Sequence, residues 1–439
     1  MNARAKALLV LERVENTDGY LNVVLDSHLQ ERPPEDPRDA GLITELCYGA
    51  TRRQMALDYA ISSCASRKVE QMEPKLLCAL RLGAYQIFYL RVARRAAVAE
   101  TVEALKQVGM DRAAGFANAV LRKLSVLESI PLPDPSDQLS HLAIRESHPA
   151  WLVSRWLRQF GRDRTLTILE ANNRSAPVVV RVNSARITRE ELIARWREMG
   201  VEVNKTLVSP VGLSLPPLGR LADLYGYPEG LFQVQDEAAQ LVGIYADLSP
   251  RARVLDACAA PGGKACHTAE TRQVVAADLH GPKLRKIQAE SQRLGLGERL
   301  RCEIHDATIP FPESWGSFDA VMVDAPCSGL GTLRRHPELR YRRQEVDLPR
   351  LASLQRKILE NCSETVPAGG LLIYAVCTPE PEEGADQMEM FLRSHPEFTA
   401  EPPTLPVSIK LPLWQSYLRT LPGPEGMDGF FAARLRKMY

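Results

Sequence analysis

The sequence predicts a multidomain protein in which an all-α domain precedes a small α+β module and a Rossmann-like α/β domain. In the first part, apolar residues recur at helical spacing, and from about residue 231 short β-branched runs alternate with helical patterns. The 439 residues exceed the roughly 100–200 residues of one ordinary domain. We therefore expect three parts, at residues 1–139, 140–230 and 231–439.

The first part carries several amphipathic helical patterns and no alternating strand pattern. Prolines at 33, 34 and 37 separate the second helix from the third, and prolines at 131, 133 and 135 indicate a linker. The expected helices cover 7–14, 21–29, 42–48, 76–88 and 98–108.

The middle part combines helical patterns at 151–160, 165–172 and 189–199 with one short β-branched run at 178–182. It is interpreted as a small α+β module that binds RNA. The last part alternates strands and helices, which predicts a doubly wound sheet with ligands at the carboxyl ends of its strands. Its expected strands cover 253–256, 274–278, 300–305, 318–324 and 371–374, with helices at 282–294 and 351–365 among them.

The composition is that of a soluble globular protein, with 45% hydrophobic and 25% charged residues and a net charge of only +1. Any nucleic-acid-binding charge must therefore be local. The absence of a long apolar run argues against a membrane span, so a cytoplasmic monomer is expected. The nine cysteines include no CxxC pair, which argues against a zinc site and a disulfide framework.

A glycine-containing turn follows the first strand of the α/β domain. Glycine lets the backbone approach a ligand closely, and the next helix offers free N–H groups. Asp278 lies 22 residues after Asp256, where nucleoside-binding sheets hold a ribose hydroxyl, and Asp306 ends the third strand near the expected adenine edge. A generic strand–turn–helix junction is the alternative. The turn consists of Cys258, Ala259, Ala260, Pro261, Gly262, Gly263 and Lys264.

Two cysteines stand at the ends of the fourth and fifth strands. Cys327 follows Asp324 after the fourth strand, and Cys377 follows the fifth. A thiolate that adds to carbon 6 of cytosine makes carbon 5 nucleophilic, and a nearby carboxyl group can stabilise the developing charge. Either cysteine alone could be a buried filler residue, but two at neighbouring strand ends beside a carboxylate favour covalent catalysis.

An arginine-rich segment lies between the two cysteine motifs. It holds five arginines against one acidic residue, and arginine suits phosphate binding and stacking on bases. A solvated loop is the alternative to RNA contact. The arginines concerned are Arg334, Arg335, Arg340, Arg342 and Arg343.

These motifs resemble those of the Nop2/Sun family of RNA cytosine methyltransferases, which read close to DxCAAPGGK, DAPCSG and TC. The resemblance extends from about residue 231 to the end, including 232–238 and 428–431. It implies that Cys377 is the nucleophile and that Cys327 assists product release. It also implies S-adenosyl-L-methionine as cofactor, contacted by residues 258–264, Asp278, Asp306 and Asp324. Val376 and Tyr341 depart from the usual Thr and Trp of the family.

The first 130 or so residues resemble the RNA-binding factor NusB, most clearly at 115–121. A NusB-like domain joined to this catalytic domain is similar to bacterial enzymes of the family that modify 16S ribosomal RNA. The implied partner is thus 16S ribosomal RNA, naked or in a partly assembled small subunit. A tRNA cytosine methyltransferase and a catalytically inactive RNA-binding assembly factor are the alternatives.

Overall fold

A computed structural model describes residues 1–216, 221–424 and 426–439. The chain divides into two compact units, and the first contains residues 1–175 together with 333–343. The second contains residues 176–332 and 344–439. None of the helices in these described ranges is both long enough and apolar enough to cross a membrane.

The first unit is all-helical, as the spacing of its apolar residues predicts. Asn2 caps the first helix by accepting a hydrogen bond from the Ala5 amide, and the ninth helix is broken at Gly161, whose φ is +71°. The expected helices at 151–160 and 165–172 are the two halves of this ninth helix. The helices are α1 (Ala3–Glu15), α2 (Leu21–Glu31), α3 (Pro37–Arg52), α4 (Gln54–Cys64), α5 (Pro74–Tyr89), α6 (Arg94–Gln107), α7 (Asp111–Ser125), α8 (Gln138–Arg145), α9 (Ala150–Asn172) and the short α14 (Leu339–Arg342).

A four-stranded antiparallel sheet with one helix opens the second unit. Its strands are β1 (Val178–Val182), β2 (Asn204–Lys205), β3 (Gly212–Leu215) and β4 (Phe232–Val234), in the order β2-β3-β1-β4. The helix α10 (Arg189–Glu198) starts with a capping box between Thr188 and Glu191. The sequence predicts that this module begins at residue 140; the compact unit that contains its sheet begins at residue 176, and α8 and all of α9 belong to the first unit.

The remainder of the second unit is built on a nine-stranded mixed sheet, which confirms the predicted α/β class. Five parallel strands match the predicted ones to within two residues: β5 (Arg253–Asp256), β6 (Gln273–Asp278), β7 (Leu300–Ile304), β8 (Ala320–Asp324) and β9 (Leu371–Val376). The sequence reasoning missed β13 (Phe431–Lys437), which pairs antiparallel with β9, and the short strands β10 (Phe398–Ala400), β11 (Leu413–Trp414) and β12 (Tyr417–Arg419).

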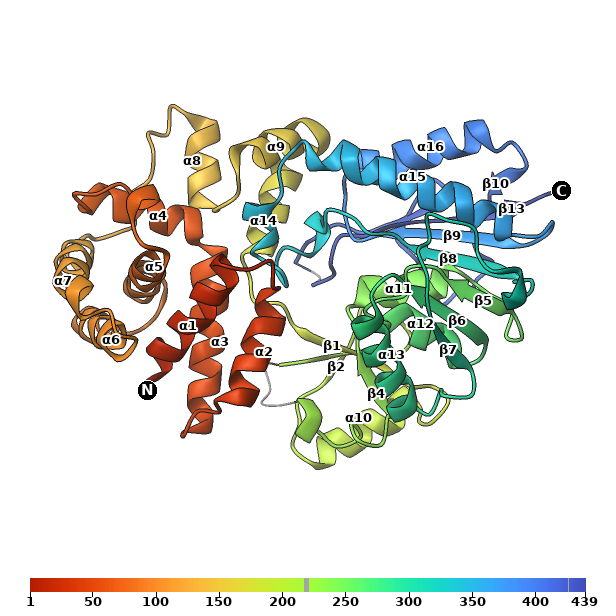
Figure 1. The fold of residues 1–439 in the computed structure, drawn as a ribbon, viewed down its shortest axis with the longest axis horizontal. Coiled ribbons are helices and arrows are strands. Elements are labelled where there is room, and N and C mark those ends of the chain that lie inside the picture. The colour runs from red at the N-terminus through yellow and green to blue at the C-terminus, as the bar shows by residue number, and fades with distance from the viewer. Residues whose placement is uncertain (217–220, 425) are drawn as a thin grey trace. The chain divides into compact units, whose positions relative to one another are not determined.

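Helices cover both faces of this sheet (Figure 1). Alternate strand residues such as Val321 and Val323 pack with apolar residues of α15 (Asp347–Thr365) and α16 (Ala385–Ser394). Residues of the opposite face, such as Met322, pack with α12 (Gly263–Ala269) and α13 (Gly281–Leu294). The helix α11 (Glu237–Tyr245) lies beside α12 on this side.

Strand order fixes where a ligand can bind. The parallel strands run β9-β8-β5-β6-β7, so the direction of winding reverses between β5 and β8. Carboxyl ends that diverge at such a switch point leave a crevice, the usual ligand site of a doubly wound sheet.

Candidate active site

Asp256 ends β5 at the switch point and is 1% exposed. Burial and then the charge of Asp324 raise its pKa, Lys264 opposes both effects, and the resulting value is about 7. Among the described residues, no side chain donates a hydrogen bond to either carboxyl oxygen. Asp256 is therefore a buried carboxyl group whose pKa is near neutral.

Lys264 and Asp324 form a buried ion pair beside this group. The Lys264 Nζ lies 2.6 Å from Asp324 Oδ2, and it lies 5.0 Å from the centroid of the Phe430 ring. Burial alone lowers the pKa of Lys264, but the charges of Asp324, Cys377 and Asp256 raise it above the ordinary lysine value. The site therefore holds a fixed positive charge next to a carboxylate.

The two cysteines of the sequence motifs lie together. Cys327 follows β8, Cys377 follows the neighbouring parallel strand β9, and their Sγ atoms are 3.1 Å apart. The pKa of Cys327 is well above the ordinary thiol value, first because of its hydrogen bond with Cys377 and then because of burial. The two sulfur atoms thus share one hydrogen bond, in which either can be the donor.

A close backbone approach fixes the loop of Cys377. The amide of Gly331 donates to the carbonyl oxygen of Cys377 at 3.0 Å, and its own carbonyl accepts from the amide of Gly429 at 2.8 Å. A Cβ atom on Gly331 would overlap the carbonyl oxygen of Gly429, so only glycine fits there.

The glycine-containing turn after β5 is tied to β6. The amide of Ala260 donates to Asp278 Oδ2 at 3.1 Å, and Gly262, with φ of +104°, is the N-terminal cap of α12. A Cβ atom at Gly262 would collide with Ile287. Asp278 Oδ1 accepts from the amide of His280 at 2.9 Å, so this carboxylate is held in one orientation at the strand end.

Asp306 follows β7 and orders its own loop. Its Oδ1 accepts from the amide of Thr308 at 2.9 Å and from the Thr308 hydroxyl at 2.8 Å. These hydrogen bonds lower the pKa of Asp306, which keeps it an acceptor at neutral pH.

Sequence reasoning missed two features of the site. Phe430 was recognised only as part of a terminal motif, and its ring packs against Lys264. Glu383 was not singled out, although it is fully buried and hydrogen-bonded to Ser328, which follows Cys327. Three glutamates lie within four positions of each other after Cys377, and no local pattern distinguishes Glu383 from Glu380 and Glu382.

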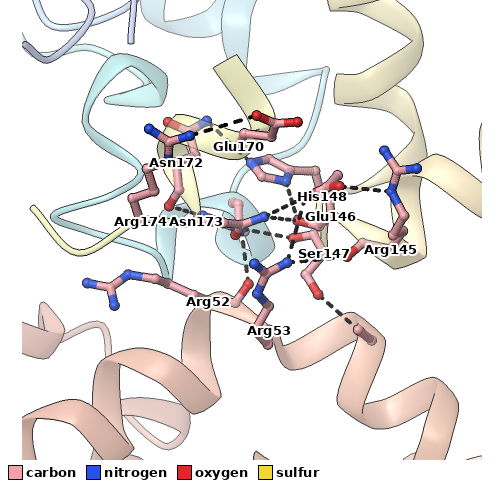
Figure 2. Close-up of polar contacts among 12 residues, drawn as sticks. Arg52, Arg53, Arg145, Glu146, Ser147, His148, Glu170, Asn172, Asn173 and Arg174 are labelled. Carbon is pink, nitrogen blue, oxygen red and sulfur yellow. Dashed lines mark hydrogen bonds and ion pairs between the residues drawn. The ribbon is translucent and has the colours of Figure 1, made fainter. Parts of the chain in front are cut away.

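The expectation of RNA contact is wrong for Arg340, because its side chain is fully buried within the helical unit. Among the described residues, the hydrogen-bond partners of its guanidinium are neutral. It donates to the carbonyl oxygens of Arg52, Ser147 and Asn172, each at 3.1 Å, and to Asn173 Oδ1 at 2.9 Å. Figure 2 shows the polar cluster that these partners belong to, in which Glu146 also contacts Arg53, Arg145 and Asn173.

The neighbouring arginines divide into two groups. Arg334 is only 4% exposed, and the guanidinium of Arg342 donates to three carbonyl oxygens at the end of α1 and in the following loop. Arg335 and Arg343 are partly exposed. Burial and hydrogen bonding therefore assign Arg340 and Arg342 to the structure of the helical unit.

Comparison with protein families divides the chain in the same order. A model described as 16S rRNA methyltransferase RsmB/F matches residues 244–436. The NusB family model matches residues 1–125, and an RsmF/B-like ferredoxin-like domain matches residues 148–217. The predicted all-α, α+β and methyltransferase parts are thereby confirmed as classes.

Solved structures share this fold. The crystal structure of PH0851 superposes with a TM-score of 0.85 at 25% identity, covering 100% of this chain and 99% of that one. NSun6 from Pyrococcus horikoshii has a TM-score of 0.59 at 19% identity, covering 67% of this chain and 99% of its own, and shows the fold alone.

Relatives match along the whole chain. The probable ribosomal RNA small subunit methyltransferase B of Bacillus subtilis (strain 168) is 34% identical over 450 residues, covering 99% of both chains. Ribosomal RNA small subunit methyltransferase B of Pseudomonas putida is 33% identical over 455 residues, covering 100% of this chain and 99% of the relative. With these relatives and the matching domain models, the chain belongs to the RsmB family of ribosomal RNA methyltransferases.

Proposed function

We propose that this chain transfers a methyl group from S-adenosylmethionine to carbon 5 of a cytosine in 16S ribosomal RNA, with Cys377 as covalent nucleophile. One observation carries the proposal: two thiols lie 3.1 Å apart beside the Lys264–Asp324 ion pair, at the carboxyl ends of adjacent strands. Methylation of carbon 5 needs a nucleophile for carbon 6, a group that stabilises charge on the ring nitrogen, and a base that removes the proton from carbon 5. We assign these roles to Cys377, to Asp324 held by Lys264, and to Cys327.

The residues at the carboxyl ends of β5, β6 and β7 fit the cofactor. Asp278 and Asp306 are carboxylates with lone pairs left for the ribose hydroxyls and for the adenine amino group. The turn at residues 258–264 lies next to Asp278, and its glycines let a ligand approach the backbone. When bound, S-adenosylmethionine supplies an electrophilic methyl group.

Cys377 begins the proposed reaction. Its thiol gives its proton to the Asp324 carboxylate, and the resulting thiolate adds to carbon 6 of the cytosine. Asp324, held by Lys264, passes that proton to the ring nitrogen, which makes carbon 5 nucleophilic. The ammonium of Lys264 stabilises the negative charge as it moves between these groups.

Cys327 ends the reaction: its thiol releases its proton to solvent, and the thiolate takes the proton from carbon 5. The bond between carbon 6 and the Cys377 sulfur then breaks, and its electron pair leaves on that sulfur. In the free protein the hydrogen bond with Cys377 is the main reason for the raised pKa of Cys327. The bond to carbon 6 removes this hydrogen bond, so Cys327 loses a proton more easily. The contact between the two thiols supports an order in which Cys377 acts first and Cys327 second.

The RNA substrate is assigned from relatives that are described as ribosomal RNA small subunit methyltransferase B. Arg335 and Arg343 are the members of the arginine-rich segment that we retain as RNA contacts. Bisulfite sequencing of 16S ribosomal RNA from cells with and without the chain tests the proposal. We expect one protected cytosine that is lost in the deletion strain and restored by the wild-type chain but not by Cys377→Ala. No lost site in 16S RNA would contradict the assignment of substrate.

A further inference from the structure

The residues that follow the two cysteines belong to a buried polar network of Ser328, Thr378, Glu383 and Gln355. Ser328 follows Cys327 and Thr378 follows Cys377, and the hydroxyl oxygens of Ser328 and Thr378 are 2.9 Å apart. All three groups that hold this network together, Ser328, Thr378 and Glu383, are fully buried. The residues next to the two thiols are therefore joined by side chains as well as by the strand pairing of β8 with β9.

Glu383 is the centre of this network. Its Oε1 accepts from the amide of Ser328 at 2.8 Å and from Gln355 Nε2 at 3.0 Å, and its Oε2 is 2.5 Å from the Ser328 hydroxyl oxygen. A buried carboxylate is costly unless several donors satisfy it, and here three donors do. Two of these three donors belong to the residue that follows Cys327.

The network is anchored to the rest of the sheet. The Tyr374 hydroxyl, on β9 three residues before Cys377, donates to the carbonyl oxygen of Glu383 at 2.6 Å and lies 3.0 Å from Gln355 Oε1. Gln355, on α15, also donates to the carbonyl oxygen of Pro326 at 2.9 Å, immediately before Cys327. Ser328, after Cys327, contacts Glu383 directly, and Thr378, after Cys377, is joined to it through Ser328. Hydrogen bonds from β9 and α15 hold Glu383 itself in place.

We infer that Glu383 is a positioning residue that holds Cys327 and Cys377 at reacting distance from each other. It touches neither thiol, and it acts through Ser328 and Thr378. This inference rests on the covalent chemistry proposed above, because a release group is useful only beside the nucleophile. A shift of about 1 Å between reacting groups can cost on the order of a hundredfold in rate, so the spacing itself is functional.

The spacing can be measured without RNA. The azo reagent diamide takes two electrons and two protons from two thiols and becomes a hydrazine as a disulfide bond forms between the sulfurs. The rate of the Cys327–Cys377 disulfide, followed by mass spectrometry of the linked peptides, reports how often the two Sγ atoms meet. In the full-length wild-type chain we expect rapid linkage, since the atoms are already 3.1 Å apart.

Three substitutions separate positioning from general stability. Glu383→Ala removes the acceptor and should slow disulfide formation at least about tenfold. Glu383→Gln keeps one oxygen for the two N–H donors while its amide faces the Ser328 hydroxyl, which can accept; its rate should stay within about threefold of wild type. Leu284→Ala opens a cavity on the opposite face of the sheet, in a cluster that contains no residue of the network, and should leave the rate unchanged.

A fourth variant covers the case in which Glu383→Ala does not fold. Thr378→Val keeps the shape of the side chain but removes the hydroxyl that joins the two loops, so it should also slow linkage. With RNA, Glu383→Ala should accumulate covalent enzyme–RNA complex and lower kcat and KM together, because Cys327 is displaced from the adduct and release becomes slow.

The outcomes distinguish this inference from the proposed function. A wild-type linkage rate in folded Glu383→Ala and Thr378→Val would overturn the positioning role. Slow linkage in these variants, rapid linkage in Glu383→Gln, and no RNA adduct in any variant would support the positioning role and contradict the covalent function.

Discussion

Replacing Arg340 with methionine should open the polar cluster of the helical unit. The guanidinium has four neutral acceptors within 3.1 Å, but three of them share the two hydrogens of Nη1, so they amount to about three hydrogen bonds of roughly 2 kcal/mol each from a charged donor. Burial lowers the pKa of Arg340 to about 10, which corresponds to roughly 3 kcal/mol of opposing cost. The net loss for Arg340→Met is then about 3 kcal/mol.

Hydrogen–deuterium exchange measures this loss locally, which suits a chain with two compact units. Amides at 145–148 and 170–174, where partners of Arg340 lie, should exchange about 100-fold faster in Arg340→Met. Arg350→Met is the matched control, because Arg350 is exposed and pairs only with Asp347 at 3.1 Å among the contacts described for its side chain. Unchanged exchange at both segments in Arg340→Met would refute the structural role of this arginine.

Three further predictions concern the cofactor, pH and RNA. Asp278→Ala should weaken S-adenosylmethionine binding by about 1.5–3 kcal/mol, and unchanged affinity in calorimetry would contradict the ribose assignment. The pKa of Asp256 is raised to about 7, so the folded state binds a proton that the unfolded state releases near pH 4, and this group's contribution to stability is lost as pH rises through that window. Asp256→Asn should therefore gain stability over wild type from pH 5 to pH 8 in urea unfolding, and an equal difference at both pH values would oppose this reasoning. The first 230 residues hold 31 Lys and Arg against 27 Asp and Glu, a net charge of +4, whereas residues 231–439 hold 24 against 27, a net charge of −3. Removing 1–139 should thus weaken RNA binding and its salt dependence while methyl-donor binding persists. Equal RNA affinity of the shortened and full-length chains in filter binding would contradict a role of residues 1–139 in RNA binding.

Much of the catalytic fold could be predicted from sequence because parallel strands are buried on both faces. Such strands are short, nearly continuous apolar runs in the sequence, as in 274–277 and 371–374. The strand β13 could not be recognised in this way, because its Arg434, Arg436 and Lys437 interrupt the apolar pattern. Its place beside β9 comes from pairing between distant segments, which local spacing does not encode.

The same distinction applies to the site. Asp256, Asp324, Cys327 and Cys377 could be placed together because each follows a strand, and the carboxyl ends of parallel strands meet at one edge. Glu383 could not, because its partner Ser328 is 55 residues away. Arg340 was misjudged because composition does not distinguish an arginine that meets phosphate from one that meets buried carbonyl oxygens.

The covalent mechanism is tested most directly by single substitutions of the two cysteines. Labelled 16S RNA, methyl donor and each variant are mixed and run on a denaturing gel, where a protein–RNA adduct migrates slowly. Cys327→Ala should give the slow band, because Cys377 still attacks and the product is not released. Cys377→Ala and the double variant should give none, since release is irrelevant when no bond forms. A slow band with Cys377→Ala and none with Cys327→Ala would transfer the nucleophile role to Cys327 and contradict the mechanism.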